Sequence, residues 1–239
     1  MSPSDAATLD GARVLVTGAS RGYGAAIARS LAAEGAHLLL TATDAARLGP
    51  VADECRGLGA AEVQCLQLDL HDAASVDALT AEVAGLVSRL EGVVLNASIL
   101  GARGPIAQIA PADMEAAIAV NVTHQLRLIS GIEPLIARGA GVVVVTSGAA
   151  GKPGRGAYGV TKGMMDVVAD VLRDEWADRE VRVVRVNPGP LRTDMRAAMY
   201  PAEDPATVPP PAERVPPVIA VLQGADPGPF IEASEWGLS

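Results

Sequence analysis

Residues 17–24, TGASRGYG, decide the fold of this 239-residue chain, because they join a short apolar run to a helical pattern. The apolar run is Val14–Val16, and the helical pattern begins near Tyr23. The glycines of the stretch permit a tight turn and close approach of other backbone. The helix start behind the turn offers unpaired N–H groups and the positive end of the helix dipole to a phosphate. We therefore expect a strand, a glycine turn and a helix that bind the pyrophosphate of a dinucleotide.

Apolar runs and helical patterns alternate along the rest of the chain. Strands are expected at residues 13–17, 37–42, 62–68, 93–95, 141–146 and 181–187. Helices are expected from the glycine turn to Gly35, over much of 47–58 with Pro50 in its first turn, from an N-cap at Ser75 to about Arg89, over 111–137 and over 158–176. Strands as apolar as GVVVVT are typical of a parallel sheet covered on both faces. The prediction is a single α/β domain over residues 1–239, with a Rossmann-type doubly wound parallel sheet and helices on both faces.

Composition restricts the partners and the location. The chain has 28 Asp and Glu against 19 Lys and Arg, and this net charge of −9 argues against nucleic acid or an anionic membrane as the main partner. No apolar run is long enough to cross a bilayer, and MSPSDAATLD resembles no secretion signal, so a cytoplasmic location is expected. Cys55, Cys65 and the three histidines lack the spacing of metal ligands, so no metal is expected.

Tyr158 and Lys162 stand one helical turn apart in YGVTK, so their side chains share one face of the predicted helix. An ammonium close to a phenol favours the phenolate, which allows proton exchange near neutral pH. The alternative is that Tyr158 packs in the core and Lys162 is solvated, since such a pair alone is weak evidence. Their position favours catalysis, because ligands of an open parallel sheet bind beyond the carboxyl ends of its strands, where Ser147 and the glycine loop also lie.

In combination these motifs resemble the short-chain dehydrogenase/reductase family over about residues 10–200. The family's Thr-Gly-x-x-x-Gly-x-Gly loop corresponds to residues 17–24 and its Asn-Asn-Ala-Gly stretch to residues 95–98, with Ser98 in place of the last glycine. Its Tyr-x-x-x-Lys pair corresponds to Tyr158 and Lys162, and its Pro-Gly motif to residues 187–189.

The resemblance implies a catalytic tetrad of Asn121, Ser147, Tyr158 and Lys162. Ser147 would hydrogen-bond the substrate oxygen, Tyr158 would exchange its proton, and Lys162 would bind the nicotinamide ribose. An alignment anchored on the glycine at position 151 would put Gly148 in the serine's place, but Gly148 offers no hydroxyl. Asn121 would hold a water that links Lys162 to solvent, or it could be a structural amide that bends its helix.

The resemblance also implies a set of cofactor-binding residues. They are Gly18, Ser20, Arg21, Gly22, Tyr23, Gly24, Thr43, Asp69, Leu70, Asn96, Ala97, Ser98, Tyr158, Lys162, Pro188, Gly189, Leu191 and Thr193. Asp69 would contact the adenine, although it could instead cap the following turn. Asn96 could tie neighbouring strands together in either case.

The implied reaction is NADP(H)-dependent interconversion of a carbonyl and a secondary alcohol on a small to medium organic molecule, with reduction favoured. One alternative is a retired enzyme that binds dinucleotide as a sensor or interaction partner, which the intact tetrad disfavours. A methyltransferase or sugar epimerase would share the glycine loop without requiring this order of Ser, Tyr and Lys.

The residues at the end of the second predicted strand favour NADP(H) over NAD(H) as the cofactor. Ala42 stands where an NAD-selective site has an acid, and Arg21 can pair with a 2′-phosphate. Asp44 would reverse this preference if the turn brought its carboxylate to the ribose.

Two further expectations concern the surface. Residues 191–217 are expected to form a substrate lid, in which the proline-rich part 195–217 is mobile. The family commonly assembles through its fourth and fifth helices, and an apolar surface here predicts a homodimer or homotetramer. That surface is formed by Met164, Val168, Val171 and Leu172. Phe230–Ala233 replaces the family's glycine-rich C-terminal end, so the dimer is favoured over the tetramer.

Overall fold

The computed structural model describes residues 8–237, and within them seven parallel strands form one sheet in the order β3-β2-β1-β4-β5-β6-β7. The strands are β1 (Arg13–Val16), β2 (His37–Ala42), β3 (Glu62–Gln67), β4 (Leu90–Leu95), β5 (Ile136–Val145), β6 (Arg182–Asn187) and β7 (Phe230–Glu232). Strand order reverses between β1 and β4, which opens a crevice at the carboxyl ends of the strands. The predicted doubly wound parallel sheet is confirmed.

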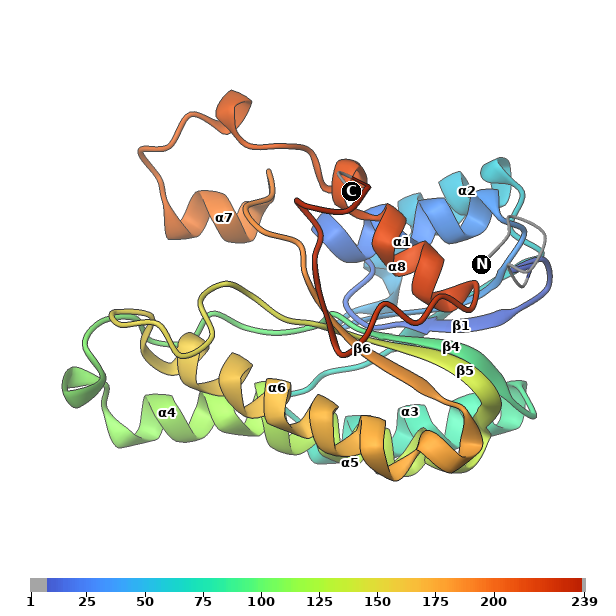
Figure 1. Ribbon diagram of the computed structural model, residues 1–239, viewed down its shortest axis with the longest axis horizontal. Helices are drawn as coiled ribbons and strands as arrows, with labels where there is room; N and C mark the ends of the chain where they lie inside the picture. The colour runs from blue at the N-terminus through green and yellow to red at the C-terminus, as the bar shows by residue number, and fades with distance from the viewer. Residues whose placement is uncertain (1–7, 238–239) are drawn as a thin grey trace.

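Helices cover both faces of this sheet, as Figure 1 shows. One face carries α1 (Gly22–Ala33), α2 (Gly49–Leu58) and α8 (Pro216–Leu222), and the other carries α3 (Ala73–Leu86), α4 (Pro111–Ile118), α5 (His124–Ile132) and α6 (Gly156–Glu175). Side chains alternate across a strand, so Val14 and Val16 enter one buried cluster while Leu15 enters the other. The central strands are apolar on both faces because each face has its own core.

The helix predicted over residues 111–137 is divided and shorter than expected. After α4, residues Ala119–Thr123 form a π turn, and α5 then ends at Ile132. A 3-10 turn, Glu133–Leu135, contains Pro134, whose missing N–H cannot extend the α-helix. Strand β5 therefore begins at Ile136, not at residue 141 as predicted.

The N-cap predicted at Ser75 is also wrong. Asp72 caps α3, because its carboxylate accepts a hydrogen bond from the backbone N–H of Ala74 at 2.9 Å. The Ser75 hydroxyl instead accepts from the backbone N–H of Asp69 at 2.9 Å, across the turn that follows β3. The helix ends at Leu86, which lets β4 begin at Leu90 rather than near residue 93.

The segment after β6 contains short elements that the sequence analysis did not resolve. Residues 191–217 include α7 (Asp194–Met199) and two 3-10 turns, Pro205–Thr207 and Pro211–Arg214. Strand β7 was missed because it is three residues long and its strand character comes from pairing with β6. Among the described residues, no helix has the length and apolarity needed to cross a bilayer.

Candidate active site

A cleft of ≈ 940 Å³ lies at the carboxyl ends of the strands. Its lining comes from the glycine loop, from residues at or just beyond the ends of β2 to β6, from the first turns of α6 and from the start of the 191–217 segment. The cleft therefore lies where an open parallel sheet binds its ligands.

Most residues predicted to bind the cofactor or act in catalysis line this one cleft. They are Gly18, Ser20, Arg21, Gly22, Tyr23, Thr43, Leu70, Asn96, Ala97, Ser98, Ser147, Tyr158, Lys162, Pro188, Gly189, Leu191 and Thr193. Gly24, Asp69 and Asn121 lie outside the lining.

The glycine loop adopts backbone conformations that favour glycine. Gly18 and Gly22 have φ values of +67° and +58°. At Gly24 a Cβ would lie 2.3 Å from the carbonyl oxygen of Gly18, so this glycine allows the first turn of α1 to pack under the loop. Gly24 thus shapes the loop from below, while the other two glycines face the cleft.

Thr17 and Asn96 hold the loop to the end of β4. The Thr17 hydroxyl accepts hydrogen bonds from the backbone N–H groups of Asn96 and Ala97 at 2.9 and 3.0 Å. The Asn96 amide donates to the carbonyl oxygens of Thr17 and Gly18 at 2.9 and 3.2 Å. These bonds fix the distance between two strand ends that both border the cleft.

The pair predicted to exchange a proton lies on the first turns of α6. Tyr158 and Lys162 are both buried, with 8% and 6% of their surfaces exposed. The Lys162 ammonium donates to the carbonyl oxygen of Val145 at 2.8 Å and lies 5.7 Å from the centroid of the Tyr158 ring. An ammonium has three N–H donors, so this geometry leaves others for a ligand in the cleft.

Ser147 follows β5 and lines the cleft with this pair. Its hydroxyl oxygen accepts from the backbone N–H of Ala149 at 3.2 Å, which leaves the hydroxyl hydrogen available for a substrate oxygen. The preceding Thr146 donates its hydroxyl to Asp166, and burial raises the pKa of that carboxyl.

Asn121 lies in the π turn and is 3% exposed. Its amide oxygen accepts from the N–H of Ile99 at 2.8 Å, and its NH₂ group donates to the Ile99 carbonyl at 2.9 Å and to the Thr161 hydroxyl at 3.0 Å. The side chain therefore joins the segment after β4 to α6, next to Lys162. This arrangement matches the structural-amide alternative, since both amide hydrogens have protein partners.

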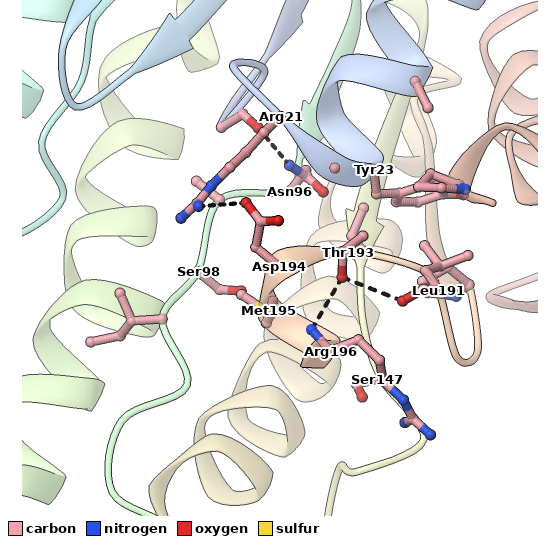
Figure 2. A pocket seen from close by; sticks show the side chains of 18 of the residues that line it. Arg21, Tyr23, Asn96, Ser98, Ser147, Leu191, Thr193, Asp194, Met195 and Arg196 are labelled. Carbon is pink, nitrogen blue, oxygen red and sulfur yellow. Dashed lines mark hydrogen bonds and ion pairs between the residues drawn. The ribbon is translucent and has the colours of Figure 1, made fainter. Parts of the chain in front are cut away.

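Arg21 and Asp194 face each other across the cleft, as Figure 2 shows. The Arg21 Nη1 lies 2.8 Å from the Asp194 Oδ2, with side-chain exposures of 66% and 74%. An ion pair this exposed contributes little to stability, so a phosphate can compete with Asp194 for the guanidinium. Thr193 caps α7 by accepting from the N–H of Arg196 at 3.2 Å.

Two aspartates that the sequence analysis considered for contact with the adenosine lie outside the cleft lining. Asp44 accepts from the N–H of Ala46 at 2.9 Å and is absent from the lining, whereas its neighbour Thr43 lines the cleft. Asp69 accepts from the backbone N–H and the ring of His71 at 2.9 and 3.0 Å, and this bonding, above all from the backbone N–H, lowers the pKa of the Asp69 carboxyl.

Several residues of the lining were not predicted as site residues from the sequence. They include Arg155, Glu232, Arg192, Met195, Arg196, Met199 and Tyr200. Arg155 could have been found, because it precedes Tyr158 by three residues and so shares its helix face. Glu232 could not, because it reaches the cleft only through the pairing of β7 with β6.

Comparisons with known proteins agree on one family. The family model described as short chain dehydrogenase matches residues 12–204. The uncharacterized oxidoreductase YciK of Escherichia coli K12 is 35% identical over 209 residues, which cover 85% of this chain and 82% of YciK. A short chain dehydrogenase from Salmonella enterica serovar Typhi has a TM-score of 0.89 at 29% identity, covering 98% of this chain and 99% of its own. One from Escherichia coli CFT073, crystallised with NADPH, has a TM-score of 0.86 at 30% identity, covering 95% of this chain and 98% of its own.

Proposed function

This chain belongs to the short-chain dehydrogenase family, and we propose that it is an NADP(H)-dependent oxidoreductase that interconverts a carbonyl and a secondary alcohol, chiefly as a ketone or aldehyde reductase. The observation that carries the proposal is that Ser147, Tyr158 and Lys162 line the same cleft as the glycine loop. This supports the proposal, because proton transfer and hydride transfer to one carbonyl require the proton donor and the dinucleotide to share a cleft.

The residues present fit a nicotinamide dinucleotide. The loop at Gly18 and Gly22 exposes backbone at the start of α1, where N–H groups and the helix dipole favour phosphate. The cleft volume of ≈ 940 Å³ lies within the range of about 300–1,000 Å³ found for ligand pockets. Lys162, buried beside Tyr158, would hold the ribose hydroxyls.

The protein's part in the reaction is proton transfer and orientation. The bound dinucleotide supplies or accepts the hydride. In reduction, Ser147 would donate a hydrogen bond to the carbonyl oxygen and Tyr158 would give that oxygen its proton. The Lys162 ammonium would stabilise the phenolate that remains, because an opposite charge close by favours the ionised form.

The preference for NADP(H) rests on the end of β2. Asp44 is engaged by Ala46 and lies outside the cleft, so no carboxylate at this position repels a 2′-phosphate. Arg21 lines the cleft with an exposed partner that a phosphate can replace. The E. coli CFT073 relative with bound NADPH adds support for the same cofactor.

The apolar face of α6 supports the proposal of a homodimer or homotetramer. Its members differ in part from the predicted set, because Val168 and Leu172 pack into the core. The exposed face instead consists of Val160, Met164, Val167 and Val171, with Val167 63% exposed. Helical spacing puts these four on one stripe, which a second copy would cover. Light scattering at micromolar concentration should give at least twice the monomer mass, and a monomer would contradict the assembly.

The proposed function is tested by Tyr158→Phe, which removes one oxygen from a buried ring. Turnover of a ketone and aldehyde panel with NADPH should fall by roughly 10²-fold or more, the scale of a positioned proton donor. NADPH affinity and the unfolding midpoint should stay near wild type. Wild-type turnover in the variant would overturn the mechanism, and NADPH binding without turnover of any compound by the wild-type protein would favour a dinucleotide-binding sensor.

A further inference from the structure

Three arginines surround one aromatic ring at the mouth of the cleft. The guanidinium carbons of Arg103, Arg155 and Arg196 lie 5.6, 6.0 and 3.9 Å from the centroid of the Tyr200 ring. Arg155 also donates to the Tyr200 hydroxyl, and Arg103 donates to the carbonyl oxygen of Met199 at 2.8 Å. Arg155, Arg196 and Tyr200 line the cleft itself.

The backbone places Arg103 and Arg155 side by side. Gly156 has a φ of +54°, and a Cβ there would lie 2.3 Å from the carbonyl oxygen of Ala102 and 2.9 Å from the Cα of Arg103. The N–H of Ala157 donates to the Ala102 carbonyl at 3.0 Å. The loop after β4 thus packs against the start of α6, and the side chains of Arg103 and Arg155 both extend from this contact.

Their charges are not balanced by the protein. Arg196 forms two hydrogen bonds with Glu203, at 2.6 and 2.7 Å, whereas Arg103 and Arg155 have no carboxylate within 4.0 Å anywhere in residues 8–237. The chain as a whole has a net charge of −9. Positive groups left unpaired around one ring repel each other, so an anion bound between them would be stabilised.

The carboxylates of the cleft do not fill this role. Asp194 pairs with Arg21 at the cofactor side, and Glu232 accepts from Asn187 at 2.7 Å and from Ser234 at 3.2 Å. Of the two guanidinium groups without a carboxylate partner, that of Arg155 lines the cleft, so its charge faces whatever enters this end, and Arg103 lies behind it.

Arg155 also has a fixed relation to the proposed chemistry. It stands three residues before Tyr158, on the same helix face, where Cβ atoms lie about 5–6 Å apart. We propose that the substrate is a short oxo acid, whose carboxylate is bound by Arg155 and steadied by Arg103 while its carbonyl faces Tyr158. A guanidinium matches a carboxylate with two parallel hydrogen bonds, which fixes orientation as well as affinity. This proposal rests on the proposed carbonyl reduction and names its substrate class.

The test uses a series in which the carboxylate moves away from the carbonyl one carbon at a time: pyruvate, acetoacetate and levulinate, each compared with its methyl ester. For the wild-type protein with NADPH, kcat/KM for at least one acid should exceed that of its ester by about 10- to 100-fold, the worth of a charge-assisted hydrogen bond. In Arg155→Gln the acid-to-ester ratio should fall to about one. Lys152→Gln removes a charge from the same loop, outside the cleft, and should keep the wild-type ratio.

Each failure has its own signature. Equal turnover of acids and esters by the wild type, or an unchanged ratio in Arg155→Gln, would overturn the oxo-acid proposal and leave carbonyl reduction standing. Absence of turnover for every compound would count against the proposed function. Calorimetric titration of the NADP⁺-loaded protein with the same acids and esters then measures their affinities without turnover, and so tests the carboxylate site independently of catalysis. Acids binding no tighter than esters would refute it.

Discussion

The floor of the cleft and the lid above it are built in different ways. The floor, meaning the glycine loop, the strand ends and the first turns of α6, is held by buried bonds such as those of Thr17 to Asn96 and of Lys162 to Val145. The predicted lid, residues 191–217, has one six-residue helix, α7, then two 3-10 turns before the first residues of α8, and α7 stands apart from the two layers in Figure 1. The residues proposed for the chemistry therefore lie on elements fixed by internal hydrogen bonds, whereas the segment beside them has few regular elements.

Several side chains connect the lid to the floor. Tyr23, on α1, donates to the carbonyl oxygen of Arg214 at 2.6 Å, and burial raises the pKa of its phenol well above the usual value. Arg21 pairs with Asp194, and Arg103 donates to the Met199 carbonyl. Two of these three contacts are exposed, so they can be exchanged for ligand contacts at little cost.

The largest effect should come from the floor, with Lys162→Ala. This change removes the buried ammonium beside Tyr158 and leaves the Val145 carbonyl without its partner, so kcat should fall by roughly 10²- to 10⁴-fold. Lys152→Ala, in an exposed loop, is the control and should leave kcat within about twofold of wild type. Steady-state NADPH oxidation checks both variants, and similar rates for the two would contradict the role given to Lys162.

Gly24→Ala should damage the floor through packing alone. The new Cβ would lie 2.3 Å from the Gly18 carbonyl and 2.6 Å from the Asn96 amide nitrogen, so unfolding free energy should drop by about 1–3 kcal/mol. Gly57→Ala, on α2, meets no atom within 4 Å and should be neutral or slightly stabilising. Urea unfolding measures the difference, and equal midpoints would show that the loop tolerates the added methyl group.

A smaller effect is expected where lid and floor meet, at the Arg21–Asp194 pair. Arg21→Ala should weaken NADPH binding by about tenfold, because one charge-assisted contact is lost, while NADH binding changes little. Asp194→Asn should strengthen NADPH binding, since it removes a carboxylate that competes with the 2′-phosphate for Arg21 and also repels that phosphate. Fluorescence titration of the two variants with both cofactors checks this. Equal losses of NADPH and NADH affinity in Arg21→Ala, or tighter binding of NADH by the wild-type protein, would overturn the assignment of NADP(H).

The smallest signal concerns motion of the lid. Amide hydrogens of residues 195–217 should exchange faster than those of β4 and β5, since short 3-10 turns protect few N–H groups. Exchange in this segment should slow when NADPH is added. Protection from exchange equal to that of the sheet, with no change on adding NADPH, would show that this segment is not mobile.

Most of the floor could be predicted from the sequence, whereas the predicted lid was given a range but no secondary structure or contacts. Val14–Val16, the glycine turn and the Tyr158–Lys162 spacing depend on local periodicity, which short sequence windows contain. The π turn at Asn121 and the early start of β5 were missed because helical periodicity does not reveal an extra residue in a turn or the effect of Pro134. Tyr200 joins Arg103 and Arg155 only through tertiary packing, so no local pattern contains that cluster.

We propose that a hydride passes in this cleft from a nicotinamide to a carbonyl while Tyr158 supplies the proton. The most direct measurement is mass spectrometry of the alcohol formed from a carbonyl substrate and NADPH that carries deuterium at the transferred position of its nicotinamide ring. The wild-type protein should give one deuterium per alcohol molecule, and Tyr158→Phe should give a roughly 10²-fold lower yield at equal NADPH occupancy. An alcohol without deuterium, or an undiminished yield from Tyr158→Phe, would contradict this proposal.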